Sequence, residues 1–176
     1  MKALITAPFQ ESGLEILQKY MDIKYENWRE TNVLYENPED YIEKIRKEEA
    51  DVLITEGDEI DREVINSCDI KIIGVCRGDP VNVDLEAATD KRVPVFYTPH
   101  RNADAVADLT IALMLSQLRH LTEIDRTLKL GDFFVDTAEA LTQMFERFKG
   151  SELGGRTVGI IGFGAIGYRV AKRSVS

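Results

Sequence analysis

The regular alternation of short apolar runs with helical patterns over the first hundred residues constrains the fold most. The apolar runs are KALIT, DIKYEN, DVLIT, KIIGVC and VPVFYT. The first four are each followed, after a short connection, by a segment whose apolar residues are spaced as in a helix. The fifth is followed by the next section of the chain. Strands connected through helices pair in parallel, and the helices then cover both faces of the sheet. Residues 1–100 are therefore predicted to form a domain of the α/β class, a flavodoxin-like, doubly wound sheet of five parallel strands.

The predicted helices between these strands carry recognisable start signals and buried stripes. Tyr41, Ile42 and Ile45 are spaced as one buried face behind Pro38, and Asp84 is placed to cap the helix that follows it. Parallel sheets bind ligands at the carboxyl ends of their strands. The loops expected at that edge are residues 6–10, 55–60, 75–82 and 97–102.

After Pro99 the pattern changes to ADAVADLTIALMLSQLRHLTEIDRTLK, which predicts one long helix opened by Asn102 as its cap. Between Ala105 and Leu118 this segment is apolar nearly all round, so we expect it to be buried on several sides, between domains or between subunits. An irregular arm with a helix around residues 137–148 should follow. The expected organisation is thus a domain over residues 1–100 and a second section over residues 101–176.

The last twenty residues, TVGIIGFGAIGYRVAKRSVS, contain a glycine motif. Residues 157–161 are predicted to form a buried strand, and a helix should begin at Ala165. Gly162, Gly164 and Gly167 then have the spacing G-x-G-x-x-G, which suits a tight turn, approach of a pyrophosphate, and close strand–helix packing. The acidic residue that would bind the ribose belongs about 20 residues further on. That position lies beyond residue 176, so NAD and NADP both stay open.

Two interpretations fit GVCRGDPVNVDLEAA at the end of the fourth predicted strand. In one, the backbone N–H groups around Arg77 and Gly78 form a nest for a carboxylate, limited by Pro80, which has no N–H. In the other, Asp79 and Pro80 form an ordinary turn and the Arg77 side chain is solvated. Residues alone do not separate these interpretations.

The histidines and cysteines suggest ordinary roles. His100 could transfer a proton at neutral pH, but no acid stands at a distance typical of a motif, and His120 is expected on the polar face of the long helix. Cys68 and Cys76 are eight residues apart, form no C-x-x-C pair and have no histidine nearby. We therefore expect two reduced thiols and no metal site.

The net charge of −9 and the isoelectric point near 4.8 argue against binding to nucleic acids or anionic membranes, which require a basic surface. No apolar run reaches the length of a membrane span, and MKALITAPFQ lacks the layout of a signal peptide. A cytoplasmic protein with a small-molecule ligand is expected.

Together the motifs resemble the D-isomer-specific 2-hydroxyacid dehydrogenase family, which includes phosphoglycerate, glycerate and formate dehydrogenases. VNVDLEAATDKRVPVFYTPHRNADAVADLTIALML is similar to the family's stretch between its substrate and cofactor lobes. ELGGRTVGIIGFGAIGYRVAKR is similar to the start of the cofactor lobe, the first strand-turn-helix of a Rossmann domain. The ordered combination covers almost the whole chain and is far more specific than the glycines alone.

The resemblance implies a two-lobed oxidoreductase that holds NAD in a cleft between its lobes and converts a small D-2-hydroxy acid to the 2-keto acid. Arg77 and Gly78 would hold the substrate carboxylate through backbone amides, and Val106 would lie beside the nicotinamide. The helix over residues 103–129 and the following arm would build a two-fold homodimer. The residues that would cradle the pyrophosphate are Gly162, Gly164, Ala165, Ile166 and Gly167.

Three departures from the family pattern matter. The family's catalytic arginine, glutamate and histidine all follow the glycine motif, so none is expected in this chain, and a chain ending at Ser176 should not turn over. The polar end AKRSVS suits a chain cut short. Many relatives also carry an arginine where this sequence has Glu56, which would repel a phosphate and favour a hydroxy acid with an uncharged tail.

Two alternatives fall outside catalysis. Flavodoxin-like domains also serve as phosphoacceptor receivers and flavin carriers, but the first loop, TAPFQES, lacks the acids of a receiver and is poor in the hydroxyls and glycine of a flavin phosphate loop. Neither of these explains the terminal glycines. A second alternative keeps the family and makes the chain a dimerising module that regulates a full-length partner.

Overall fold

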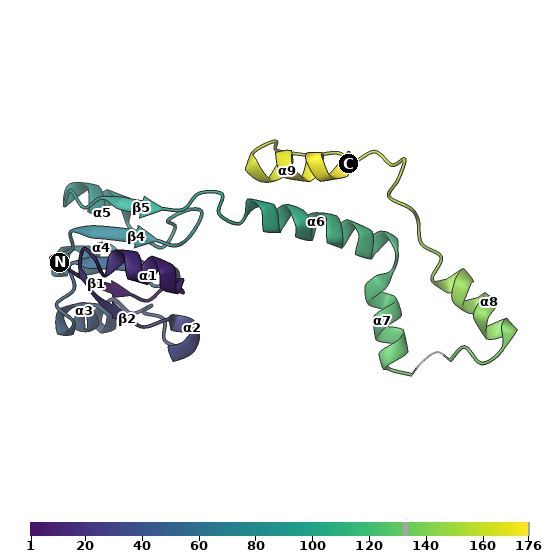
Figure 1. Cartoon of the computed structure of the whole chain (residues 1–176), viewed down its shortest axis with the longest axis horizontal. Helices are drawn as coiled ribbons and strands as arrows, with labels where there is room; N and C mark the ends of the chain where they lie inside the picture. The colour runs from purple at the N-terminus through teal and green to yellow at the C-terminus, as the bar shows by residue number, and fades with distance from the viewer. Residues whose placement is uncertain (132–133, 176) are drawn as a thin grey trace. The chain divides into compact units, whose positions relative to one another are not determined.

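The computed structural model describes residues 1–131 and 134–175. It divides into two compact units, Met1–Arg101 and Asn102–Ser176, which are described separately below (Figure 1). The assignment of these units to a substrate lobe and the beginning of a cofactor lobe stays a prediction at this point.

The first unit contains the predicted sheet. Its strands are β1 (Lys2–Ile5), β2 (Asp22–Tyr25), β3 (Val52–Thr55), β4 (Ile72–Val75) and β5 (Val95–Tyr97). All neighbours pair in parallel in the order β2-β1-β3-β4-β5, with Ala3 opposite Val52 and Val52 opposite Ile72. This is the flavodoxin-like strand order, and it confirms the predicted fold class.

Helices lie between the strands as the sequence predicts. They are α1 (Glu11–Leu17), α3 (Pro38–Lys47), α4 (Arg62–Ser67) and α5 (Leu85–Asp90). Asp84 caps α5 by accepting a hydrogen bond from the Ala87 N–H, and Asp61 caps α4 through the Val64 N–H. The short helix α2 (Trp28–Thr31) was not predicted from the sequence. It has a single turn and too few residues to show a period.

Successive strand residues point to opposite faces of the sheet and supply two separate cores. Leu4, Leu53 and Ile73 pack with the helices α3, α4 and α5, and the predicted stripe on α3 is buried with them. Ala3 and Val52 point to the other face, which α1 covers. Because both faces are covered, the strands are apolar along their length rather than alternating.

The second unit begins with α6 (Ala103–Leu118), and this helix ends earlier than predicted. His120 adopts a left-handed conformation with φ of 54°, and α7 (Leu121–Lys129) starts after it. The carbonyl of Leu118 accepts a hydrogen bond from the Ser151 N–H at 2.9 Å. The single long helix expected from the sequence is therefore wrong, because a tertiary hydrogen bond from the chain beyond α8 (Ala138–Arg147) occupies a carbonyl at the end of α6.

Within its own unit α6 is buried on one side only, so its expected burial between domains or between subunits stays a prediction. Only Ala103 and Ala107 are buried, whereas Leu109 and Leu113 are 58% and 60% exposed. Asn102 stands at the cap position but forms no side-chain capping hydrogen bond. The neighbour of α6 in this unit is α9 (Ala165–Ser174), which covers the side with the alanines and leaves the leucines at the surface.

Residues 157–161 do not form the predicted buried strand. The side chain of Ile161 is fully exposed, and no strand is present among the described residues of the second unit. A strand is stable only when a partner satisfies its N–H and C=O groups. The apolar sequence of this segment signals a buried environment that the described part of the chain does not supply.

Within the described residues, helices are either too short or too polar to cross a bilayer.

Candidate functional site

The glycine motif forms a turn that leads directly into a helix. Gly162 has φ of +87°, a conformation that side chains other than glycine rarely adopt. Gly164 is the N-terminal cap of α9, and its carbonyl accepts the Tyr168 N–H at 3.0 Å. The sequence prediction of a turn followed by a helix from Ala165 is confirmed, although the strand that should precede the turn is absent from the described residues.

The third glycine of the motif, Gly167, is required for steric reasons. A Cβ atom on Gly167 would lie 2.2 Å from the carbonyl oxygen of Gly162, so only glycine lets the helix lie this close to the turn. At Gly164, by contrast, a Cβ atom would meet no protein atom within 4 Å. The turn is thus packed on its helix side and open at Gly164, where the N-terminus of α9 can accept an anion. These residues fit the pyrophosphate of a dinucleotide.

The turn also lies against α6. Thr110 and Met114 of α6 line a pocket of about 320 Å³ together with Gly162, Ile166 and other residues of the turn region. Val106, one turn before Thr110, is half-buried, and its carbonyl accepts the Thr110 hydroxyl at 2.7 Å. The second unit therefore brings the helix that carries Val106 and the glycine turn into one neighbourhood. The contact of Val106 with a nicotinamide stays a prediction.

In the first unit, Arg77 and Gly78 form an exposed loop after β4. Thr98, at the end of β5, donates both its N–H and its hydroxyl to the Arg77 carbonyl, at 2.9 and 3.1 Å. This pair of hydrogen bonds holds the loop at the carboxyl edge of the sheet. In this position the loop could bind a substrate carboxylate through its backbone N–H groups, and that role stays a prediction.

Glu56, after β3, is surrounded by donors that sequence reasoning did not single out. Its carboxylate accepts the Trp28 indole N–H at 3.1 Å and pairs with Arg29 at 3.3 Å and with Arg101 at 2.6 Å. Arg77 also donates to the Glu56 carbonyl at 3.4 Å. The lone repelling charge expected from the sequence is therefore not what the structure contains.

The electrostatics of Glu56 follow from these contacts. Burial raises its pKa, but the hydrogen bonds from Trp28 and Arg101 and the charges of Arg29 and Arg101 outweigh burial and hold the pKa below its usual value. The carboxylate stays ionised and compensated at neutral pH. The available signal was positional, because Arg29 and Arg101 follow β2 and β5 at the same edge of the sheet as Glu56.

The two histidines occupy turns. His100 has φ of 64° and lies between β5 and α6, close to Gly78. His120 stands at the junction of α6 and α7, so the expected place on a polar helix face is wrong. Among the described residues, neither imidazole forms a side-chain hydrogen bond or an ion pair with an acid. The part of the chain that the structure describes therefore supplies neither histidine with the orienting partner of a catalytic base.

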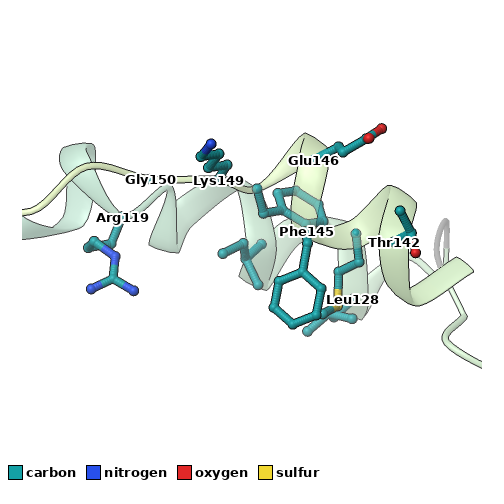
Figure 2. Close-up of a pocket in the computed structure, with 10 residues that line it drawn as sticks. Arg119, Leu128, Thr142, Phe145, Glu146, Lys149 and Gly150 are labelled. Atoms are coloured by element: carbon teal, nitrogen blue, oxygen red, sulfur yellow. The ribbon is translucent and has the colours of Figure 1, made fainter. Parts of the chain in front are cut away.

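A larger pocket, of about 740 Å³, lies between α7 and α8 and is separate from the predicted site residues. Figure 2 shows Leu128 and Phe145 in it, and Ile124, Met144 and Phe148 contribute further apolar surface. Polar side chains also line it, namely Arg119, Thr142, Glu146 and Lys149 (Figure 2). The pocket has the chemistry of a surface that contacts another apolar element rather than that of a catalytic centre.

Comparisons with known proteins agree with the resemblance seen in the sequence. The family model described as "D-isomer specific 2-hydroxyacid dehydrogenase, catalytic domain" matches residues 3–150. A Bacillus subtilis protein named "Putative 2-hydroxyacid dehydrogenase YoaD" is 42% identical over 174 residues, which cover 98% of this chain and 49% of that protein. A glyoxylate reductase of Thermococcus litoralis is 34% identical over 175 residues, covering 98% of this chain and 50% of the relative.

Among solved structures, the TT0316 protein from Thermus thermophilus is similar, with a TM-score of 0.80 and 29% identity. The match covers 99% of this chain and 53% of that one. The chain thus spans about half the length of these relatives.

Proposed function

The chain belongs to the D-isomer specific 2-hydroxyacid dehydrogenase family, and from this membership we propose that the whole protein is an oxidoreductase that interconverts a small D-2-hydroxy acid and its 2-keto acid with NAD(P). The observation that carries the proposal is the glycine turn at Gly162 and Gly164, which leads into α9 and follows a flavodoxin-like lobe in the sequence.

When bound, NAD(P) would supply the acceptor of a hydride from the hydroxy acid, or the donor of one to the keto acid. The residues of this chain would bind and orient the cofactor and the substrate. Gly162 and Gly164, with Ala165 and the N–H groups at the start of α9, would hold the pyrophosphate, joined by Ile166 and by Gly167, whose missing side chain keeps α9 close to the turn.

The proposed substrate-binding loop belongs to the first unit. The loop at Arg77 and Gly78, held by Thr98, would bind the substrate carboxylate through backbone amides. Arg29 and Arg101 lie at this edge of the sheet, paired with Glu56, and an arginine can bind the carboxylate of an acid.

Proton transfer is assigned to groups that the family resemblance places after the glycine motif. For this reason we expect the 176-residue chain by itself to bind ligands weakly and not to turn over. NAD, rather than NADP, is the first cofactor to test.

We further propose a homodimer formed through α6, α7 and the arm with α8. The support is the apolar surface of the second unit, where Leu109, Leu113 and Leu128 are more than half exposed and the pocket between α7 and α8 is apolar. Cys68 and Cys76 are free, as in a reducing compartment, and with the acidic composition this supports a cytoplasmic protein.

The test begins with the DNA after codon 176, read in frame. The proposal expects it to encode a ribose-binding acid and then an arginine, a glutamate and a histidine. The protein so encoded should oxidise reduced NAD with glyoxylate, followed by the absorbance of the nicotinamide. A reading frame without these residues, or a protein with them that shows no turnover on any small 2-keto acid, contradicts the proposal.

A matched pair of variants tests whether the cofactor binds at the glycine turn. Gly164→Val should raise the KM for NAD by about tenfold or more, because its side chain enters the open space where the pyrophosphate would lie. Gly154→Val adds the same side chain at another glycine whose Cβ would meet nothing within 4 Å, outside the turn, and should leave KM unchanged. Equal values for the two variants would count against the cradle.

A further inference from the structure

We propose that Asp104 and Asp108 of α6 are positioning residues for the cofactor, because they grip α9 and so fix the pyrophosphate turn relative to Val106. The proposal rests on the proposed function, and it adds a role that neither the glycine motif nor the family comparison assigns to these aspartates.

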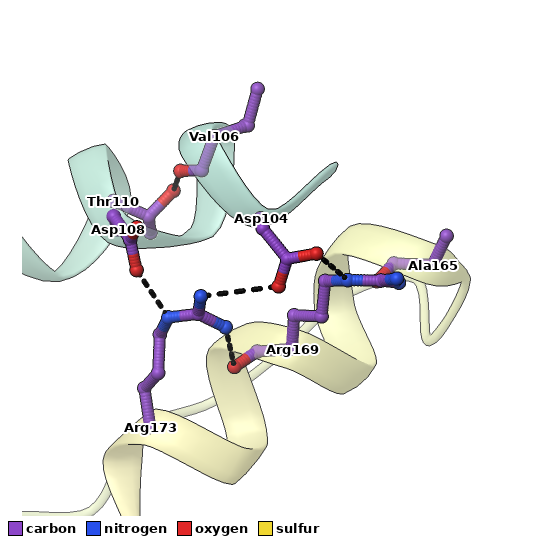
Figure 3. Close-up of polar contacts among 7 residues, drawn as sticks. All are labelled: Asp104, Val106, Asp108, Thr110, Ala165, Arg169 and Arg173. Carbon is purple, nitrogen blue, oxygen red and sulfur yellow. Dashed lines mark hydrogen bonds and ion pairs between the residues drawn. The ribbon is translucent and has the colours of Figure 1, made fainter. Parts of the chain in front are cut away.

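The contact consists of ion pairs between the aspartates of α6 and two arginines of α9, called the ladder below (Figure 3). Arg169 donates from Nε to Asp104 Oδ2 at 2.9 Å, and Arg173 donates from Nη2 to Asp104 Oδ1 at 3.2 Å. Arg173 also donates from Nε to Asp108 Oδ1 at 2.5 Å. Both partners of the ladder are spaced four residues apart on their helices, so one face of α6 matches one face of α9.

The arginines are held in place by their own helix. Arg169 donates from Nη1 to the Ala165 carbonyl at 2.9 Å, and Arg173 donates from Nη1 to the Arg169 carbonyl at 3.2 Å (Figure 3). Each guanidinium therefore bonds α9 and α6 at once. Such a fixed fork restricts the position of one helix along the other more tightly than a single flexible pair.

The packing beside the ladder allows a close approach. Ala103 and Ala107 of α6 and Val170 of α9 are buried where the two helices contact each other. Alanine and valine side chains are small, so they set the separation of the helices but leave sliding along the axis poorly determined. The ion pairs supply that missing restraint.

The location of the ladder connects it to the cofactor. Val106 lies between Asp104 and Asp108 in the sequence, on the same turns of α6. Ala165, whose carbonyl holds Arg169, is the first residue of α9 after the Gly164 cap. The ladder therefore joins the turns of α6 that carry the nicotinamide contact to the first turns behind the pyrophosphate cradle. A ligand that reaches both places depends on their separation, whereas a ligand that occupies only the cradle does not.

Exposure separates this role from stabilisation of the fold. The side chains of Asp104 and Asp108 are 69% and 68% exposed, and those of Arg169 and Arg173 are 33% and 28% exposed. Exposed pairs contribute little to folding and are weakened by salt. Hydrogen bonds from Arg169 and Arg173 hold the pKa of Asp104 below its usual value, so this carboxylate is ionised at neutral pH.

The experiment compares two ligands on the protein used for the kinetic assay. NADH reaches the cradle and the nicotinamide contact, and ADP-ribose reaches the cradle alone. In the double variant Asp104→Asn with Asp108→Asn, affinity for NADH should fall by about fivefold, the size expected for an exposed ionic network. Affinity for ADP-ribose should not change. Added salt should reproduce the same selective loss in the unsubstituted protein.

Two further variants complete the design. Asp125→Asn removes an exposed aspartate whose partner, Lys129, is also four residues away, but on α7, and it should change neither affinity. Exchange of charges, Asp108→Arg with Arg173→Asp, should restore part of the NADH affinity lost in Asp108→Arg alone. Equal losses of both ligands in the double variant would mean that the ladder only maintains α9, and unchanged NADH affinity would mean that it has no role; either result overturns the proposal. Failure of the unsubstituted protein to bind either ligand would instead remove the proposed function, and this inference with it.

Discussion

Asp58 has no exposed surface, yet its carboxylate is fully engaged. It accepts the hydroxyl of Thr6 and that of Thr55 on one oxygen, and the Tyr35 N–H on the other at 2.9 Å. The Asp58 carbonyl accepts the Asn82 amide at 2.8 Å. A buried polar side chain is tolerated only with such a set of hydrogen-bond partners. This residue therefore ties together loops at the carboxyl edge of the sheet, where the substrate is proposed to bind.

We predict that Asp58→Ala lowers the free energy of unfolding by about 3 kcal/mol, because several buried donors lose their acceptor at once. Trp28 is the one tryptophan of the sequence and lies in the first unit, so its fluorescence in urea reports on the unfolding of that unit. Glu59→Ala removes an exposed neighbouring carboxylate and should change stability by less than about 0.5 kcal/mol. A similar change in both variants would disprove the role of Asp58.

Residue roles were predictable where they depend on near neighbours in the sequence. Asp84 caps its helix as predicted, because the donor it needs lies three residues away. Asn102 has the right residue type at the right place but forms no such hydrogen bond. The partners of Glu56 come from residues 27 and 45 positions away, Arg29 and Arg101, and no local pattern announces them.

At the scale of elements, the position of α9 against the turn requires glycine at residue 167, although glycine disfavours a helix. Alanine is favoured over glycine inside a helix by about 1 kcal/mol, but a Cβ atom here would clash with the Gly162 carbonyl. We predict that Gly167→Ala loosens α9 from the turn, seen as faster amide hydrogen exchange over residues 165–170. Gly164→Ala meets no protein atom within 4 Å and serves as the control, with exchange unchanged. Slower exchange in Gly167→Ala would contradict the prediction, because the helix propensity of alanine would then outweigh the clash with the Gly162 carbonyl.

The strands of the first unit were predicted as elements, because each is a short apolar run between turn signals and finds a partner nearby. The same kind of run at residues 157–161 was predicted as a strand and is not one in the described chain. The break between α6 and α7 was missed because it depends on Ser151, thirty-three positions after Leu118. Periodicity identifies an element, whereas its ends and its pairing depend on distant parts of the chain.

At the scale of the whole molecule, the exposed apolar side chains of the second unit predict association. We expect light scattering at micromolar concentration to give about twice the mass of 19.9 kDa. Leu113→Glu should reduce it to the monomer mass, because the charge would be buried in the interface. Leu85→Glu, at an exposed leucine of α5 in the first unit, should leave the dimer intact. A monomeric unsubstituted chain would refute the proposed dimer.

The sequence by itself determined the five-stranded parallel lobe, the glycine turn before α9 and the family, because these depend on local apolar periods and on residue types at short spacings. Only the tertiary structure decided that Glu56 is paired with arginines, that α6 stops at Leu118, and that Asp104 and Asp108 grip α9. These features join side chains far apart in the chain, and a side chain's partner follows from the path of the backbone through space rather than from its neighbours in the sequence.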